Sequence, residues 1–158
     1  MTMTTSRVDI ARQGRRARMH EAAKTEILQA GRRQIAAGGI SAVSLRGIAS
    51  EIGMTAPGIY RYFAKLDDVL VALAEQVDHE LAQEAIAELS DLQATANELA
   101  REIDPETVAK VNKDFDAATI RVLQRWATEK PGEWSLLFAT PGSPGSTRVL
   151  RILQDVHG

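Results

Sequence analysis

The segment at residues 44–63, SLRGIASEIGMTAPGIYRYF, limits the possible fold more than any other part of the chain. Four apolar residues recur at the spacing i, i+3, i+4 and i+7, which predicts a short helix with one buried face: Leu45, Ile48, Ala49 and Ile52. Ser44 is a typical N-cap for this helix, and Gly53 ends it. Thr55 is the expected cap of a second helix, with Pro57 in its first turn, where a missing N–H breaks no hydrogen bond. Two short helices joined by a glycine-containing turn form a helix-turn-helix pattern.

The remaining sequence predicts helices separated by short breaks, and no segment stands out with the period of a strand. We therefore expect an all-α fold, in which a three-helix head is joined by a long helix to an all-helical body. The expected domains are a flexible Arg-rich arm at 1–19, the helix-turn-helix domain at 20–65 and a helical domain at 66–158. The expected helices cover about 20–37, 45–52, 56–62, 66–89, 91–103, 104–129 and 148–156, with a loop at 140–147.

Charge is distributed unevenly along the chain, although the formal net charge is only −2. Residues 1–65 contain 11 Lys and Arg against four Asp and Glu, whereas residues 66–158 contain 8 against 17. A basic N-terminal region on an acidic remainder is typical of a protein that binds a polyanion. The alternative is a chance clustering of solvated surface charges.

Several classes of protein are disfavoured by what the sequence lacks. It has no cysteine, which excludes disulfides and thiolate metal sites, and no apolar run that approaches a membrane span. No apolar region follows the first arginines, so we expect a cytoplasmic protein without a signal peptide. Common catalytic motifs are missing, and Glu75 and His79, four residues apart, lack an evident third metal ligand. We therefore predict neither an enzyme nor a metal or cofactor site.

The second helix of a helix-turn-helix lies in the DNA major groove, with its first residues toward the bases. Small residues open this helix, which allows close approach to DNA: Thr55, Ala56, Pro57 and Gly58. Tyr60 is expected to reach a phosphate, and Arg61 a phosphate or the edge of a guanine. Arg46, at the start of the preceding helix, is a further candidate for a phosphate contact.

The other aromatic residues of this segment are not assigned a DNA contact. Ile59 and Phe63 are expected in the core, while Tyr62 fits the core and the surface equally well.

The arm has four arginines that suit a neighbouring minor groove, or equally a disordered solubilising tail: Arg12, Arg15, Arg16 and Arg18.

Residues 20–75, which include GGISAVSLRGIASEIGMTAPGIYRYFAKLDDVL, resemble the N-terminal domain of the tetracycline-repressor (TetR) family of bacterial transcription regulators. The resemblance implies a three-helix DNA-binding head, a fourth helix that links it to a ligand-binding and dimerising body, and repression relieved by a small molecule. The family usually has Lys or Arg where this chain has Leu66. Lys65 is the candidate replacement for that phosphate contact, but a shift of one residue turns a side chain by about 100° on a helix.

The body resembles a C-terminal domain of some family members only around RWATEKPGEWSLLFATPGSPG. Four aromatic residues outside the head are candidates for lining a site for a small apolar or amphipathic effector: Phe115, Trp126, Trp134 and Phe138. Core packing is the alternative for each of them. The family's dimer uses two long C-terminal helices, whereas this sequence predicts one short final helix, which indicates either a compact body or an absent segment near 140–147.

The resemblance implies a homodimer on a palindromic operator, with recognition helices about 34–36 Å apart. The main alternative is a constitutive or architectural helix-turn-helix protein that binds DNA without an effector. The head does not distinguish these two functions, because only the body differs between them.

Overall fold

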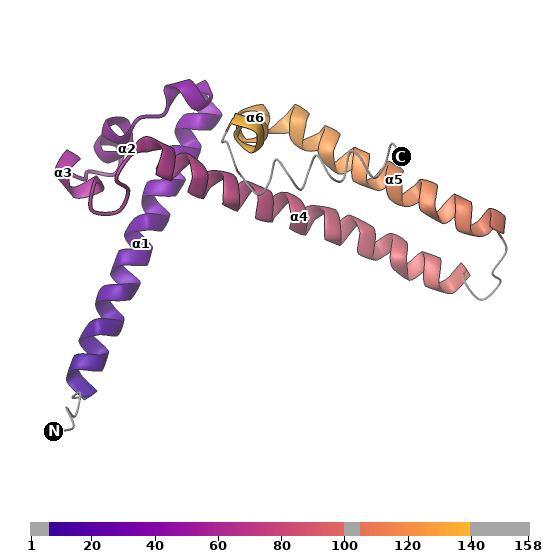
Figure 1. Ribbon diagram of the computed structural model, residues 1–158, viewed down its shortest axis with the longest axis horizontal. Coiled ribbons are helices and arrows are strands. Elements are labelled where there is room, and N and C mark those ends of the chain that lie inside the picture. Colours follow the sequence, from indigo (N-terminus) through magenta and orange to yellow (C-terminus); the bar gives the residue numbers. More distant parts are fainter. Residues whose placement is uncertain (1–6, 100–104, 140–158) are drawn as a thin grey trace. The chain divides into compact units, whose positions relative to one another are not determined.

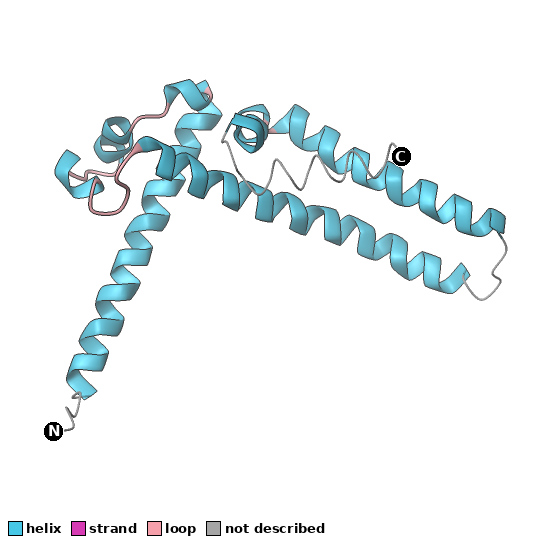
Figure 2. Ribbon diagram, viewed as in Figure 1, coloured by secondary structure: helices cyan, strands magenta, loops and turns pink. Residues whose placement is uncertain are grey.

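The computed structural model describes residues 7–99 and 105–139 of the chain (Figure 1). Within these ranges the secondary structure is helical, with helices joined by short loops and no strand (Figure 2), which confirms the all-α prediction. The chain divides into two compact units, Met1–Val69 and Leu70–Gly158. We call the described residues of the first unit the head and those of the second unit the body, and we describe each separately.

The head contains α1 (Arg7–Gly38), the short 3-10 helix η1 (Ile40–Ala42), α2 (Leu45–Glu51), α3 (Ala56–Ile59) and the first residues of α4 (Leu66–Leu99). Helix α2 packs against both α1 and α3, and η1 packs against the end of α1. The largest side chains that are fully buried in the head are aliphatic and come from each of its main helices: Ile27, Ile35, Ile48, Ile59 and Val69. Because these side chains are buried, the opposite faces of α2 and α3 are the ones exposed to solvent.

The segment predicted as an arm at 1–19 is helical from Arg7 onward, where it forms the first part of α1. Ala, Arg, Gln and Met favour a helix, so this segment extends α1 at little free-energy cost. Its residues from 11 to 22 are exposed or nearly so, which leaves no apolar stripe for the sequence pattern to detect. The predicted helix at 20–37 is therefore the C-terminal part of a longer one.

Local capping determines where the two short helices begin and how they connect. The Ser44 hydroxyl accepts a hydrogen bond from the Gly47 N–H at 3.0 Å, and the Thr55 hydroxyl accepts one from the Gly58 N–H at 3.2 Å, which confirms both predicted caps. Between the helices, Gly53 has a φ of 67°, a value that L-residues rarely adopt. The Met54 N–H then donates to the Ala49 carbonyl at 2.8 Å, which is the hydrogen bond of a Schellman motif.

The body contains the rest of α4, α5 (Pro105–Glu129) and α6 (Pro131–Ala139). The two predicted helices at 66–89 and 91–103 are instead one continuous helix as far as Leu99, because Ser90 and Asp91 are tolerated within a helix and no Gly or Pro interrupts it. The predicted break at Pro131 is confirmed, since α5 ends at Glu129 and Pro131 opens α6. The predicted loop at 140–147 and helix at 148–156 lie outside the described residues. None of the helices in the described ranges combines the length and apolar character that a membrane crossing requires.

A polar cluster joins α4 to α5 within the body. The Trp126 indole N–H donates to the Glu84 carboxylate at 2.7 Å, and Arg125 donates to the same oxygen at 3.2 Å. The Lys130 ammonium lies 3.8 Å from the centroid of the Trp126 ring and 3.5 Å from the other Glu84 oxygen. We call these four residues the Glu84 cluster. Burial disfavours the Glu84 charge, but the hydrogen bonds from Trp126 and Arg125 and the charge of Lys130 outweigh it, so the pKa of Glu84 lies below its ordinary value.

Candidate nucleic-acid interface

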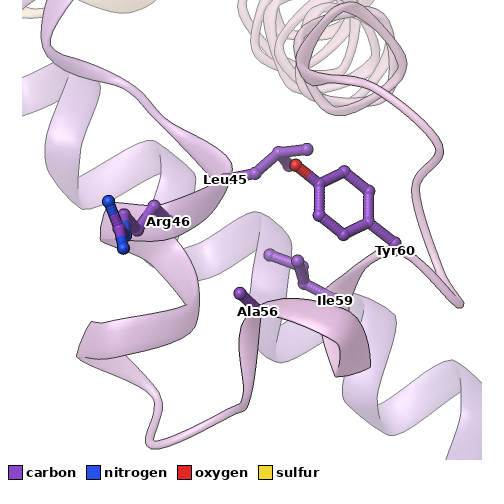
Figure 3. A pocket seen from close by; sticks show the side chains of 5 residues that line it. All are labelled: Leu45, Arg46, Ala56, Ile59 and Tyr60. Atoms are coloured by element: carbon purple, nitrogen blue, oxygen red, sulfur yellow. The ribbon is translucent and has the colours of Figure 1, made fainter.

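A groove of about 300 Å³ opens on the head between the start of α2 and the end of α3. It is lined by Leu45 and Arg46 of α2, Ala56 and Ile59 of α3, and Tyr60 directly after α3. Figure 3 shows Arg46 and Tyr60 at opposite ends of this groove, with Leu45 and Ile59 between them. The structure thus brings together three of the residues predicted to contact DNA, Arg46, Ala56 and Tyr60.

The first turn of α3 is narrow and open to solvent. Thr55, Ala56 and Pro57 are exposed, while Ile59 is fully buried and holds the helix against the core. A side chain at Gly58 would meet Met54 Cγ and the Thr55 hydroxyl at 3.0 Å each, so glycine permits the close contact with this cap. Because the Thr55 hydroxyl accepts the Gly58 N–H, its oxygen is used in capping. The outer face of α3 therefore offers a slim, largely apolar surface of the kind that can approach base edges.

The three aromatic residues after α3 occupy three environments. Phe63 is buried, and the Tyr62 ring is half-buried, with its centroid 4.9 Å from that of His20 on α1. The side chain of Tyr60 is 57% exposed. Helix α3 ends at Ile59, earlier than the predicted residue 62, but Tyr62 and Phe63 still donate their N–H groups to the Ile59 carbonyl. The turn therefore leaves Tyr60 as the exposed aromatic residue of this segment, and Arg61 beside it is also exposed.

An ion pair that the sequence pattern did not predict connects α1 to the end of α2. Arg33 Nε lies 2.6 Å from the Glu51 carboxylate, and the Gln34 amide donates to the second Glu51 oxygen at 3.0 Å. Hydrogen bonds from Arg33 and Gln34 hold the pKa of Glu51 below its ordinary value of 4.5. The partners are 17 and 18 residues apart, so no helical spacing reveals them. The interaction fixes α2 on α1 and thereby helps to orient α3.

Lys65 lies outside the groove, directly before α4. Its side chain is exposed, with the ammonium 3.8 Å from a carboxylate oxygen of Asp67, and its backbone N–H donates to Asp68 Oδ2 at 3.2 Å. Asp68 thus closes the start of α4 in the manner of a capping box. Leu66, where a basic residue was expected from the resemblance, is half-buried.

The four aromatic residues proposed for an effector site differ in exposure. Trp126 is 1% exposed, with its ring and N–H both held in the Glu84 cluster. Phe115 and Trp134 are half-buried, and Phe138 is 45% exposed. The rings of Trp134 and Phe138 meet edge to face on α6, with centroids 5.3 Å apart. Trp134 and Phe138 therefore retain surface for a ligand, whereas Trp126 is positioned to support the packing of α4 and α5.

The comparison with protein families bears on the same part of the head. A family profile described as bacterial regulatory proteins of the tetR family matches residues 27–73, which cover the buried part of α1, the helix-turn-helix and the start of α4. The head therefore carries the helix-turn-helix domain that this tetR-family profile describes.

Three curated mycobacterial proteins are similar to this chain, and each is named an HTH-type transcriptional regulator. They are Mb1846 of Mycobacterium bovis, and MT1864 and Rv1816 of Mycobacterium tuberculosis. Each is 32% identical over 130 residues, a stretch that covers 82% of this chain and 49% of the relative. The chain thus spans about half the length of the curated relatives that it matches.

A solved structure supports the fold of this chain. The crystal structure of SCO4313, a protein whose regulatory role is itself inferred, aligns with 89% of this chain and 60% of its own, with a TM-score of 0.54 and 25% identity. The expected fold class and the resemblance to the tetR family are therefore both confirmed.

Proposed function

We propose that this chain is a transcriptional repressor that binds a palindromic operator as a homodimer and is released by a small apolar or amphipathic effector. The observation that carries the DNA-binding part is the groove with Arg46 and Tyr60 at its ends, beside the exposed first turn of α3. An arginine and a tyrosine hydroxyl are both common phosphate ligands, and a slim helix start between them suits the approach to a major groove.

Base reading and phosphate contact would be divided between neighbouring residues. Tyr60 is exposed at the groove and positions the head on the backbone through its hydroxyl. Arg61 is exposed one residue later and has the planar donors that match the O6 and N7 atoms of guanine. Arg46 and Lys65 add phosphate contacts, while the residues from Thr55 to Gly58 allow α3 to approach closely.

Release by an effector requires that the ligand favour one of two states of the protein. Helix α4 begins in the head and continues into the body without interruption, so a shift of this helix would reach both units. Phe115, Trp134 and Phe138 offer aromatic surface in the body, whereas Trp126 is buried. This proposal predicts that the chain binds DNA with lower affinity when an effector occupies the body.

The test begins with a gel shift on the DNA next to the chain's own gene, followed by two substitutions in the head. We expect affinity to fall steeply with salt, because most of the contacts are to phosphate. Tyr60→Phe should weaken binding to all sequences alike, whereas Arg61→Ala should also relax the preference at one base pair, by about 1–3 kcal/mol of discrimination.

Two results would contradict this proposal. Unchanged binding by both variants would place a different face of the head on DNA, and salt-insensitive binding would remove the phosphate contacts. If the chain binds DNA but no apolar compound changes its affinity or its melting temperature, the constitutive alternative holds instead.

A further inference from the structure

The first part of α1 is a long, exposed and positively charged helix that the groove of the head does not use. Tyr62, two residues after the groove residue Tyr60, stacks on His20, which marks how far the packed head extends along α1. Residues 7–19 project beyond this point as one continuous helix (Figure 1). At 1.5 Å per residue this extension is about 20 Å long, roughly the length of six base pairs.

Arginines gather on one face of this extension. Arg12, Arg15 and Arg16 follow the spacing i, i+3 and i+4, which places them within about 100° of one another around the helix. All three are exposed, and none of the ion pairs found within the described ranges involves them. The extension therefore presents a row of cations to solvent.

Two arginines of this row, Arg12 and Arg16, continue the face of α1 that packs in the head. Arg16 precedes the fully buried Ile27 by 11 residues, which on a helix is about three turns and returns to nearly the same direction. Arg12 stands in the same relation to Ala23. Arg12 and Arg16 thus project on the side of α1 that is buried in the head, whereas the residue 11 positions after Arg15 is exposed.

We propose that the extension is a second DNA-contacting element, which lies as a helix across the phosphates that flank the base pairs read by α3. The inference rests on the proposed operator binding. It assigns duplex DNA as the partner of a surface that the helix-turn-helix does not use. Charge complementarity and continuity with the groove support duplex DNA as the occupant. An α-helix is about 10–12 Å across and the minor groove about 6 Å wide, so a helical extension cannot enter that groove as an extended arm would.

The test compares the full chain with the variant Arg12→Gln/Arg15→Gln/Arg16→Gln, since glutamine favours a helix nearly as well as arginine. The probes are a duplex selected by the wild-type chain from a random library, the same duplex with about ten further base pairs on each side, and an unrelated duplex of the longer length. We expect the wild type to bind the long selected duplex roughly tenfold or more tighter than the short one, and the variant to lose this advantage. The salt slope on both long duplexes should fall by about 0.9 for each phosphate that the variant no longer neutralises.

The outcomes separate this inference from the proposed function. A variant that retains the long-duplex advantage and the wild-type salt slope would overturn the extension as a DNA contact. A wild type that selects no sequence, while the variant still loses salt slope on the unrelated duplex, would refute operator reading but support the extension. Loss of binding to anionic lipid vesicles, with DNA binding unchanged, would make a membrane surface the partner and overturn the inference.

Two substitutions at Gly14 test whether the extension acts as a helix. A Cβ at this position would meet only Arg18 Nη1, at an ordinary contact distance of 3.5 Å, so alanine fits. Gly14→Ala should bind the long duplex as tightly as the wild type or more tightly, whereas Gly14→Pro should lose affinity as the triple variant does. Normal binding by Gly14→Pro would show that the segment contacts DNA in an extended form, contrary to the inference.

Discussion

The head and the body are both built from helices, but different kinds of interaction set the positions of those helices. In the head, hydroxyl caps at Ser44 and Thr55 and a left-handed glycine at Gly53 fix two short helices within twenty residues of sequence. In the body, long helices are joined by the Glu84 cluster, whose central pair of residues is 42 positions apart. The head is thus specified mainly by local sequence, and the body by contacts between distant residues.

The head and the body differ in the same way in the surfaces that they leave available for binding. The interactions that shape the head leave Arg46, Tyr60 and Arg61 exposed and available for DNA. In the body, the largest of the fully buried side chains, Trp126, is used in packing. Function in the head can therefore be inferred from a short motif, whereas ligand binding in the body depends on which aromatic surfaces packing leaves open.

The strongest test of the comparison is Trp126→Ala in the body. Loss of this buried ring removes packing and leaves Glu84 without one donor, so we expect the free energy of unfolding to fall by about 3–5 kcal/mol. Urea unfolding followed by far-UV circular dichroism measures the change. Trp126→Phe is the matched control, because it keeps most of the ring and removes the N–H, with an expected loss of about 1 kcal/mol. Equal effects of the two variants would show that the hydrogen bond, and not the packing, holds α5 to α4.

A smaller effect is expected from Gly53→Ala in the head. An added Cβ would have nothing within 4 Å, so the change isolates the strain of a positive φ, about 1–2 kcal/mol of unfolding free energy. Gly53→Asn should be less destabilising, because asparagine adopts this conformation more readily. Thermal and urea unfolding of both variants test the prediction. A wild-type stability for Gly53→Ala would mean that this turn relaxes, and that local geometry specifies the head less strictly than we infer.

The smallest expected effect concerns pH and the Glu84 cluster. Since the pKa of Glu84 is lowered in the folded chain, its charge stabilises the fold above its ordinary pKa of 4.5, and this contribution is lost as pH falls through the lower folded value. The stability of the wild type should thus decrease more than that of Glu84→Gln between about pH 6 and pH 3. Urea unfolding at a series of pH values measures the difference. Parallel curves for the two chains would show that the charge of Glu84 does not stabilise the body.

Much of the head could be predicted because its signals lie within a few residues of one another. The caps, the glycine turn and the burial of Ile59 all follow from residues 44–63, and so does the exposure of Tyr60. The pairing of Arg33 with Glu51 could not be predicted in this way, because packing alone brings the two helices together.

Prediction from the sequence was less accurate where no apolar pattern marks a helix. Residues 7–19 are helical, and those from 11 onward are exposed or nearly so. Helix propensity without an apolar period is a weak signal, so the sequence did not reveal this part of the helix. In the body, the sequence left both an effector site and core packing open for Trp126, and it did not indicate the hydrogen bond to Glu84. Pairing between long helices depends on their relative rotation and offset, which local patterns do not determine.

The cap at the start of α4 has a consequence for the path of bound DNA. Asp68 is held in place by the Lys65 N–H, and Asp67 beside it is exposed, so two carboxylates occupy the first turn of this helix. The two carboxylates would repel a phosphate and weaken the contact proposed for Lys65, whereas a phosphate near the arginines of α1 and α2 would be attracted. The head therefore has a positive side at α1 and α2 and a negative side at the start of α4. This charge distribution would disfavour docking on DNA in the reversed direction and would limit the protected footprint on the α4 side.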